Sequence, residues 1–342
     1  MATYYVDTGL ATGNHDGTSW ANAYALLYDC YTARYVSPSL TEAMVINCRS
    51  TSGAADEYGA IIDGGWANAT YGLTIQCLSG DAAAGKWDTT KFRIASEAGW
   101  GRAFEVADEY VTLIGIQAVN TSTTGRAAFY SAAEHTTYIN CIAGGQQDTD
   151  SSGAQKGGFA ADADLSYLDY INCLAVNCYA AGFAVLSSGT RLYNCVAVGN
   201  HGLGFQLGRS PEIYNSYAGG NVASGDYALD TGTVTTCASG DGTAGTTIAY
   251  TAAGTAGTRF TNVTHGSEDV HIAEASSSLI NVGTDLHTIF TTDVDGNNRG
   301  GGGAGTWDIG VHEYQGAAAT GHPTMSRLQG IPGMKYTGRK GW

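Results

Sequence analysis

Tyr170-Ile-Asn-Cys-Leu-Ala175 is one copy of a pattern that recurs along the middle of the chain. The other copies are Tyr138-Ile-Asn-Cys-Ile-Ala143, Leu192-Tyr-Asn-Cys-Val-Ala197, Ile213-Tyr-Asn-Ser-Tyr-Ala218 and the weaker Val234-Thr-Thr-Cys-Ala238. The equivalent positions 173, 195, 216 and 237 lie 21 or 22 residues apart. A second pattern, an aromatic residue that mostly follows glycine, has nearly the same spacing, at Phe159, Phe183, Phe205 and Tyr227. Two independent patterns with one period indicate a structural repeat.

A repeat of about 22 residues occurs in leucine-rich repeats and in parallel β-solenoids. Leucine is too infrequent here for the first. The copies are rich in β-branched and aromatic residues and are bounded by Gly, Asn, Ser and Asp, which is typical of strands and turns. We therefore predict an all-β fold, a single-stranded right-handed parallel β-helix with coils of about 22 residues.

Equivalent residues of successive coils should stack on one another in this fold. We expect the cysteines to form an inward ladder and the aromatic residues a second stack. The asparagines should form an amide ladder in which each side chain bonds its neighbour; they are Asn140, Asn172, Asn194 and Asn215. Less regular copies at residues 44–48, 73–77 and 111–116 predict the first coils, and those at 260–264 and 269–273 predict late ones.

The pattern divides the chain into four parts: an N-terminal strand and capping helix (1–43), the β-helix (44–292), a closing cap (293–314) and an extended C-terminal arm (315–342). The two caps are expected because both ends of a β-helix are exposed sheet edges that must be covered. The predicted capping helix has Trp20, Tyr24, Leu27 and Tyr31 on one face, with Thr18 or Ser19 as its N-cap.

The composition excludes several classes of protein. The 31 acidic residues outnumber the 16 Lys and Arg, giving a net charge of −15, which disfavours nucleic acid as a partner because phosphate contacts need a basic surface. The apolar runs are far shorter than the ~20 residues of a membrane span. The start, Met1-Ala-Thr-Tyr-Tyr-Val-Asp7, lacks the basic and apolar stretches of a signal peptide. We expect the eight cysteines to be buried free thiols, in keeping with folding in a reducing cytoplasm.

One segment has the spacing of a calcium loop. Asp293, Asp295 and Asn297 alternate along the chain and offer the oxygen ligands that Ca²⁺ prefers. A structural interpretation competes, in which Arg299 pairs with Asp308 or Glu313 to hold a turn. No cofactor other than calcium is indicated.

A second set of residues suggests a carbohydrate-binding or carboxylate-bearing face. Asp162 and Asp164 would point the same way if they lay on a strand, with Lys156, Arg191 and Arg209 as partners. A polysaccharide lyase needs carboxylates near a basic residue, and a glycosidase needs two carboxylates ~5–9 Å apart. The competing interpretation is a set of solvated acids. No catalytic residue is assigned, because no basic residue recurs where the repeat would align it.

The composition changes after Tyr314. Residues 315–342 contain four basic residues and no acid, which leaves 12 basic and 31 acidic residues, a net charge of −19, in the rest of the chain. The segment has no β or helical period, and it either wraps its own acidic body or docks on another subunit. We predict docking, through basic residues set among apolar anchors: Arg327, Leu328, Ile331, Met334, Lys335, Tyr336, Arg339 and Trp342.

Both ends of the body resemble a known family. Tyr5-Val-Asp7 with Asp16-Gly-Thr-Ser-Trp-Ala-Asn-Ala-Tyr24, and Asp293-Val-Asp-Gly-Asn-Asn-Arg299 with Trp307-Asp-Ile-Gly-Val-His-Glu-Tyr314, resemble the opening and closing segments of bacterial and phage proteins of the pectate-lyase-like superfamily. This superfamily contains lyases, hydrolases, tailspikes, adhesins and inert shafts, so the resemblance implies the fold more than an activity. The basic Pro-Gly ending resembles those of phage structural proteins.

These observations favour a non-enzymatic virion protein, a phage decoration or fibre protein that folds in the host cytoplasm and ends on the virion surface. Its arm would dock on other virion subunits, and its acidic, Tyr- and Asn-rich surface would bind glycans. A polysaccharide lyase or glycoside hydrolase of the same superfamily is the alternative. A surface filament or adhesin subunit is a third option.

Overall fold

The computed structural model describes residues 1–34, 39–96, 101–121, 127–144, 157–222, 225–244, 259–264, 266–273, 277–302 and 306–315. Lys156 lies outside these described residues. So do all the predicted docking residues of the arm: Arg327, Leu328, Ile331, Met334, Lys335, Tyr336, Arg339 and Trp342.

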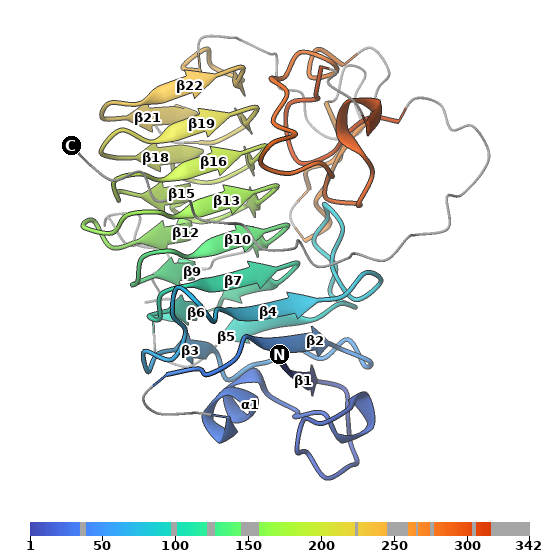
Figure 1. Cartoon of the computed structure of the whole chain (residues 1–342). Helices are drawn as coiled ribbons and strands as arrows, with labels where there is room; N and C mark the ends of the chain where they lie inside the picture. Colours follow the sequence, from blue (N-terminus) through green and yellow to red (C-terminus); the bar gives the residue numbers. More distant parts are fainter. Residues whose placement is uncertain are drawn as a thin grey trace.

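In the described part of the chain the backbone winds through three parallel sheets. Over most of the length each coil contributes one strand to each sheet (Figure 1). Sheet A has nine strands: β1 (Ala2–Asp7), β2 (Met44–Arg49), β4 (Leu73–Cys77), β7 (Val111–Ile114), β10 (Thr137–Ile139), β13 (Asp169–Ile171), β16 (Arg191–Tyr193), β19 (Glu212–Tyr214) and β22 (Thr233–Thr235). Sheet B has seven: β5 (Arg93–Ser96), β8 (Gln117–Asn120), β11 (Ile142–Gly144), β14 (Leu174–Val176), β17 (Val196–Val198), β20 (Tyr217–Gly219) and β23 (Ala238–Ser239).

Sheet C completes each coil with seven strands: β3 (Ala60–Ile62), β6 (Arg102–Val106), β9 (Ala127–Ser131), β12 (Gly157–Ala161), β15 (Ala181–Val185), β18 (Phe205–Leu207) and β21 (Tyr227–Leu229). The predicted register holds, since Tyr170 pairs with Tyr138 and with Leu192. The predicted parallel β-helix is confirmed.

The repeated Asn-Cys pair makes the corner between sheets A and B. Asn172 and Asn194 have φ of 51° and 52°, the left-handed region that asparagine tolerates better than most residues. Each turns the chain sharply at the end of a sheet A strand, so that the following cysteine points into the core. Cys173 and Cys195 are fully buried there.

The predicted aromatic stack is present in the core. The aromatic stack runs from Phe129 through Phe159, Phe183 and Phe205 to Tyr227, with ring centroids 4.8–5.0 Å apart. This spacing is that of adjacent strands, so parallel pairing itself brings the rings into contact. All eight cysteines lie in the described part and are free and buried, as expected.

The N-terminal cap differs from the prediction. A 3₁₀ turn, η1 (Trp20–Asn22), comes first, Tyr24 then forms a bridge with Val6, and the helix α1 begins only at Leu27 and ends at Ala33. The predicted caps Thr18 and Ser19 are therefore not at its start. The buried carboxylate of Asp56 accepts a hydrogen bond from the Leu27 N–H at 2.8 Å instead, a role that the sequence near the helix does not reveal.

The C-terminal region also differs from the prediction. The expected late coils are an antiparallel pair, β24 (Phe260–Asn262) and β25 (Asp269–Ile272). The segment of residues 277–302 and 306–315, called here the closing segment, contains the short turn η2 (Arg299–Gly302). It lies beside the coils (orange in Figure 1) and packs on the outer faces of sheets A and B, where Trp307 contacts the cluster of Ile171 and Tyr193. The described residues of 293–314, which were expected to cap the far end, thus contact the flank. They do so because apolar side chains of sheets A and B point outward and are covered by this segment.

None of the described helices is long and apolar enough to cross a membrane.

Candidate functional site

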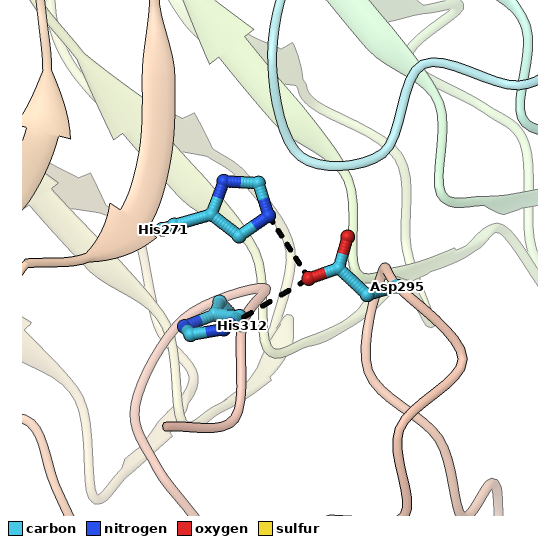
Figure 2. A group of neighbouring side chains, drawn as sticks. All are labelled: His271, Asp295 and His312. Carbon is cyan, nitrogen blue, oxygen red and sulfur yellow. Dashed lines mark hydrogen bonds and ion pairs between the residues drawn. The ribbon is translucent and has the colours of Figure 1, made fainter. Parts of the chain in front are cut away.

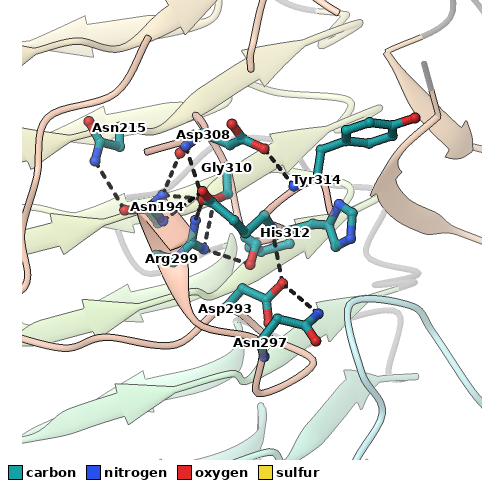
Figure 3. A network of polar contacts seen from close by, with 12 residues as sticks. Asn194, Asn215, Asp293, Asn297, Arg299, Asp308, Gly310, His312 and Tyr314 are labelled. Carbon is teal, nitrogen blue, oxygen red and sulfur yellow. Dashed lines mark hydrogen bonds and ion pairs between the residues drawn. The ribbon is translucent and has the colours of Figure 1, made fainter. Parts of the chain in front are cut away.

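The asparagine corner is where the closing segment attaches (Figure 3). The Asn194 amide donates to the carbonyl oxygens of Asp308 and Gly310, both at 2.9 Å, and the Asn172 amide donates to Thr292 O at 3.0 Å. One bond of the expected amide ladder is present among the described asparagines, from Asn215 to Asn194 at 3.3 Å. The prediction that each amide bonds its neighbour is therefore mostly wrong, because carbonyls of the closing segment take these donors.

Arg299 is the centre of this attachment. Its side chain is fully buried, and its guanidinium donates to Asn172 Oδ1 at 2.8 Å and to the carbonyls of Gly310 and Val311 at 3.0 and 2.7 Å. It also pairs with Glu313 at 3.3 Å, one of the two partners that the sequence allowed. A buried arginine with this many acceptors holds the chain in one geometry.

The three predicted calcium ligands do not converge. Asp293 is fully buried, and its carboxylate accepts the N–H groups of Asp295, Asn297 and Glu313 at 3.0, 2.8 and 3.0 Å. The Asn297 amide also donates to Asp293, at 3.2 Å. The oxygens of Asp293 are thus occupied by donors of its own turn and by the Glu313 N–H, while the Asp295 carboxylate contacts His271.

Asp295 forms a cluster with His271 and His312 (Figure 2). Asp295 Oδ2 lies 2.9 Å from His271 Nε2 and 3.8 Å from His312 Nε2. On its other side, His271 Nδ1 bonds Asp269, two residues earlier in β25. No sequence pattern indicates this cluster, because its members lie 17 to 41 residues apart along the chain (271, 295 and 312) and belong to no repeat.

The two histidines have opposite electrostatic surroundings. Burial by itself lowers the pKa of His271, but the hydrogen bonds to Asp269 and Asp295 outweigh it and raise the pKa to about 10. Burial and the charge of His271 lower the pKa of His312 to about 4. His312 is accordingly neutral, and its Nδ1 accepts the Ile272 N–H at 3.1 Å.

The predicted carbohydrate face is partly assembled. Arg209 pairs with Asp164 at 2.9 Å, and both are exposed. Arg191 makes two bonds to Asp169, at 2.6 and 2.7 Å. Asp162 and Asp164 follow β12 in a turn and do not lie on a strand, which corrects the predicted geometry; Asp162 accepts a bond from the Tyr130 hydroxyl.

Near Asp169 lies an aromatic corner that the repeat pattern does not indicate. Tyr110, His135 and Tyr167 precede successive strands of sheet A and stack with centroids 4.5 and 4.8 Å apart. The next position in this ladder is Gly189. Asp169 pairs with Arg191, and Tyr167 and Gly189 each lie two residues before these partners. Because Gly189 has no side chain, the ladder does not continue over Tyr167, which is 51% exposed.

Known proteins are similar to this chain only distantly. No family model matches the chain, and no curated protein matches it in sequence. Two solved structures are similar to it. Pectin methylesterase from Aspergillus niger is 15% identical over 70% of this chain and 75% of that one, with a TM-score of 0.43. Pectate lyase Pel9A is 12% identical over 92% of this chain and 96% of that one, with a TM-score of 0.34. At this similarity neither comparison bears on activity.

Proposed function

We propose that this protein is a non-enzymatic structural component of a virion, a phage decoration or fibre protein whose β-helix projects outward. The observation that carries the proposal is the charge division of the chain. The arm, residues 315–342, has a net charge of +4 and the body has −19. A basic arm with apolar anchors suits docking on another subunit of the virion.

The base of this arm has a fixed position on the body, which supports an anchoring role. Tyr314 donates its N–H to Asp308, and Glu313 is held by Arg299 and Asp293. The last described residue, Gln315, therefore follows two residues that are held on the flank of the coils. An anchor that begins with the next residues would have a defined starting point on the body.

The aromatic corner supports the second element of the proposal, glycan binding. An exposed tyrosine ring next to a glycine offers a face on which a sugar ring stacks. The ion pairs of Arg191 and Arg209 lie beside it and offer hydrogen bonds to sugar hydroxyls. Because these acids are already paired with arginines, the corner suits binding better than proton transfer.

The anchoring role is tested by deleting residues 315–342. We expect a folded, soluble rod with unchanged circular dichroism that is missing from purified particles, as measured by gel analysis and electron cryomicroscopy. Normal incorporation of the truncated rod would refute the docking arm.

The glycan role is tested on a polysaccharide panel, with Tyr167→Ala against Tyr58→Ala. Tyr58 is 47% exposed and its ring packs at a tilt against Tyr28 near the N-terminal cap, so it controls for loss of any exposed tyrosine. We expect only Tyr167→Ala to weaken glycan binding. Release of unsaturated sugars or new reducing ends by the wild type, lost in Asp162→Ala, would establish the lyase or hydrolase alternative instead.

A further inference from the structure

We propose that His271, Asp295 and His312 bind a divalent transition-metal ion, with zinc as the representative. The three ligand atoms lie within 4.8 Å of one another. They come from β25, from the turn after Asp293 and from the end of the closing segment (Figure 2). Their side chains are 24%, 24% and 12% exposed, so an ion has access from solvent.

The spacing of the ligand atoms suits one small ion. Ligands about 2.0–2.2 Å from a tetrahedral zinc ion are about 3.4 Å from each other. Asp295 Oδ2 is 2.9 Å from one histidine Nε2 and 3.8 Å from the other, and all three ligand atoms lie within 4.8 Å of one another, so small side-chain rotations would bring them to the spacing of a zinc site. Two imidazoles and one carboxylate favour zinc over calcium or magnesium, which prefer oxygen ligands only. A fourth position would remain for water or a partner's side chain.

The surroundings of His271 are those of a ligand held in place. Asp269 accepts from Nδ1 and so directs Nε2 toward Asp295, as carboxylates do behind many metal-binding histidines. The loop at Gly85 also approaches this ring closely, and a Cβ there would lie 2.9 Å from Val294, 3.2 Å from His271 Cε1 and 3.4 Å from His271 Nε2. The glycine lets this loop close over the ring.

Binding has one structural consequence that serves as a signature. His312 Nδ1 accepts the Ile272 N–H, so the neutral ring carries its proton on Nε2. Coordination through Nε2 moves that proton to Nδ1, and the Ile272 N–H loses its acceptor. His271 releases its Nε2 proton to solvent and keeps the one shared with Asp269. The ion would then join β25 to two turns of the closing segment, beside the base of the arm.

The test is titration of the full chain with zinc chloride after removal of metal by a chelator. We expect one equivalent to bind by calorimetry, and Asp295→Asn and His312→Gln to weaken binding by about tenfold or more. The matched control is His287→Ala. His287 repeats the local arrangement of His271, with its N–H and Nδ1 both on the carboxylate of an aspartate two residues earlier, Asp285. No metal-binding group among the described residues includes it.

Equal weakening by His287→Ala, or full affinity in Asp295→Asn, would overturn the proposal. Since the ligand variants also remove contacts of the closing segment, the wild type provides an independent measurement. Nitrogen NMR of the imidazoles should show His312 changing its protonated nitrogen on addition of zinc, together with a shift of the Ile272 amide. Stoichiometric binding without either change would place the ion elsewhere and refute the site.

Discussion

The coils and the closing segment satisfy the hydrogen bonds of their buried polar groups in different ways. In the coils each strand pairs with the equivalent strand of the next coil, about 22 residues away, and the pattern repeats. In the closing segment, Asn172 and Arg299 bond each other across 127 residues, and Asn194 and Gly310 across 116. The coils are stabilised by many similar contacts, whereas the closing segment depends on a few unlike ones. A single substitution should therefore release the closing segment while leaving the coils folded.

The largest effect is expected for Arg299→Met. The change leaves Glu313, Asn172 and two carbonyls without their buried donor, at a cost of about 3–5 kcal/mol. Urea unfolding should show a new early transition, and hydrogen exchange should rise in residues 293–314 and not in the coils. Arg209→Met, which breaks an exposed ion pair, should do neither. Uniform loss of protection along the chain would mean that the two regions unfold together.

An intermediate effect is expected from pH. Burial raises the pKa of Asp308 to about 6, although the N–H groups of Tyr314 and Asn281 oppose the rise. An aspartate in the unfolded chain has a pKa near 3.9, so the folded state binds this proton more tightly. The stability that this brings is complete below about pH 4 and is lost as pH rises through 6, by up to about 3 kcal/mol.

Asp308→Asn removes this titration. Thermal melts from pH 4 to pH 7.5 should show the wild type losing stability relative to the variant as pH rises. Asp285→Asn is the control, because hydrogen bonds from His287 lower the pKa of Asp285, so the folded protein keeps this carboxyl ionised across the range and the difference from wild type should stay nearly constant. A constant difference between wild type and Asp308→Asn across this range would contradict the assignment.

The smallest effect is expected for Asn194→Gly. Glycine keeps the positive φ of the corner but removes the amide bonds to the Asp308 and Gly310 carbonyls, at a cost of about 1–2 kcal/mol. Asn140→Gly is the matched change two corners away, where φ is 54° and the side-chain oxygen has no hydrogen-bond partner. Chemical denaturation should show a loss for Asn194→Gly only. Equal losses would mean that the asparagines act through the turn and not through the closing segment.

The coils were predictable from sequence because their contacts have a period. Cys173 and Cys195 could be aligned by counting residues, and the structure stacks them accordingly. The start of α1 was not predictable, because its capping carboxylate, Asp56, lies 29 residues from Leu27. The cluster of His271, Asp295 and His312 was missed for the same reason. Of the predicted calcium ligands only Asp295 belongs to this cluster. The sequence does not show that backbone N–H groups occupy the carboxylate oxygens of Asp293.

The asparagine corner poses a problem of alignment. It offers nearly the same docking position on every coil, so the closing segment could in principle dock one coil out of register in either direction. The closing segment removes that ambiguity because it uses each position differently. Asn172 receives Arg299, Asn194 holds two carbonyls, and Asn215 both donates to and accepts from Thr284. If the closing segment were displaced by one coil, Arg299 would face an asparagine other than Asn172, its hydrogen-bond partner. The irregular sequence of the closing segment therefore selects one register on an otherwise periodic surface.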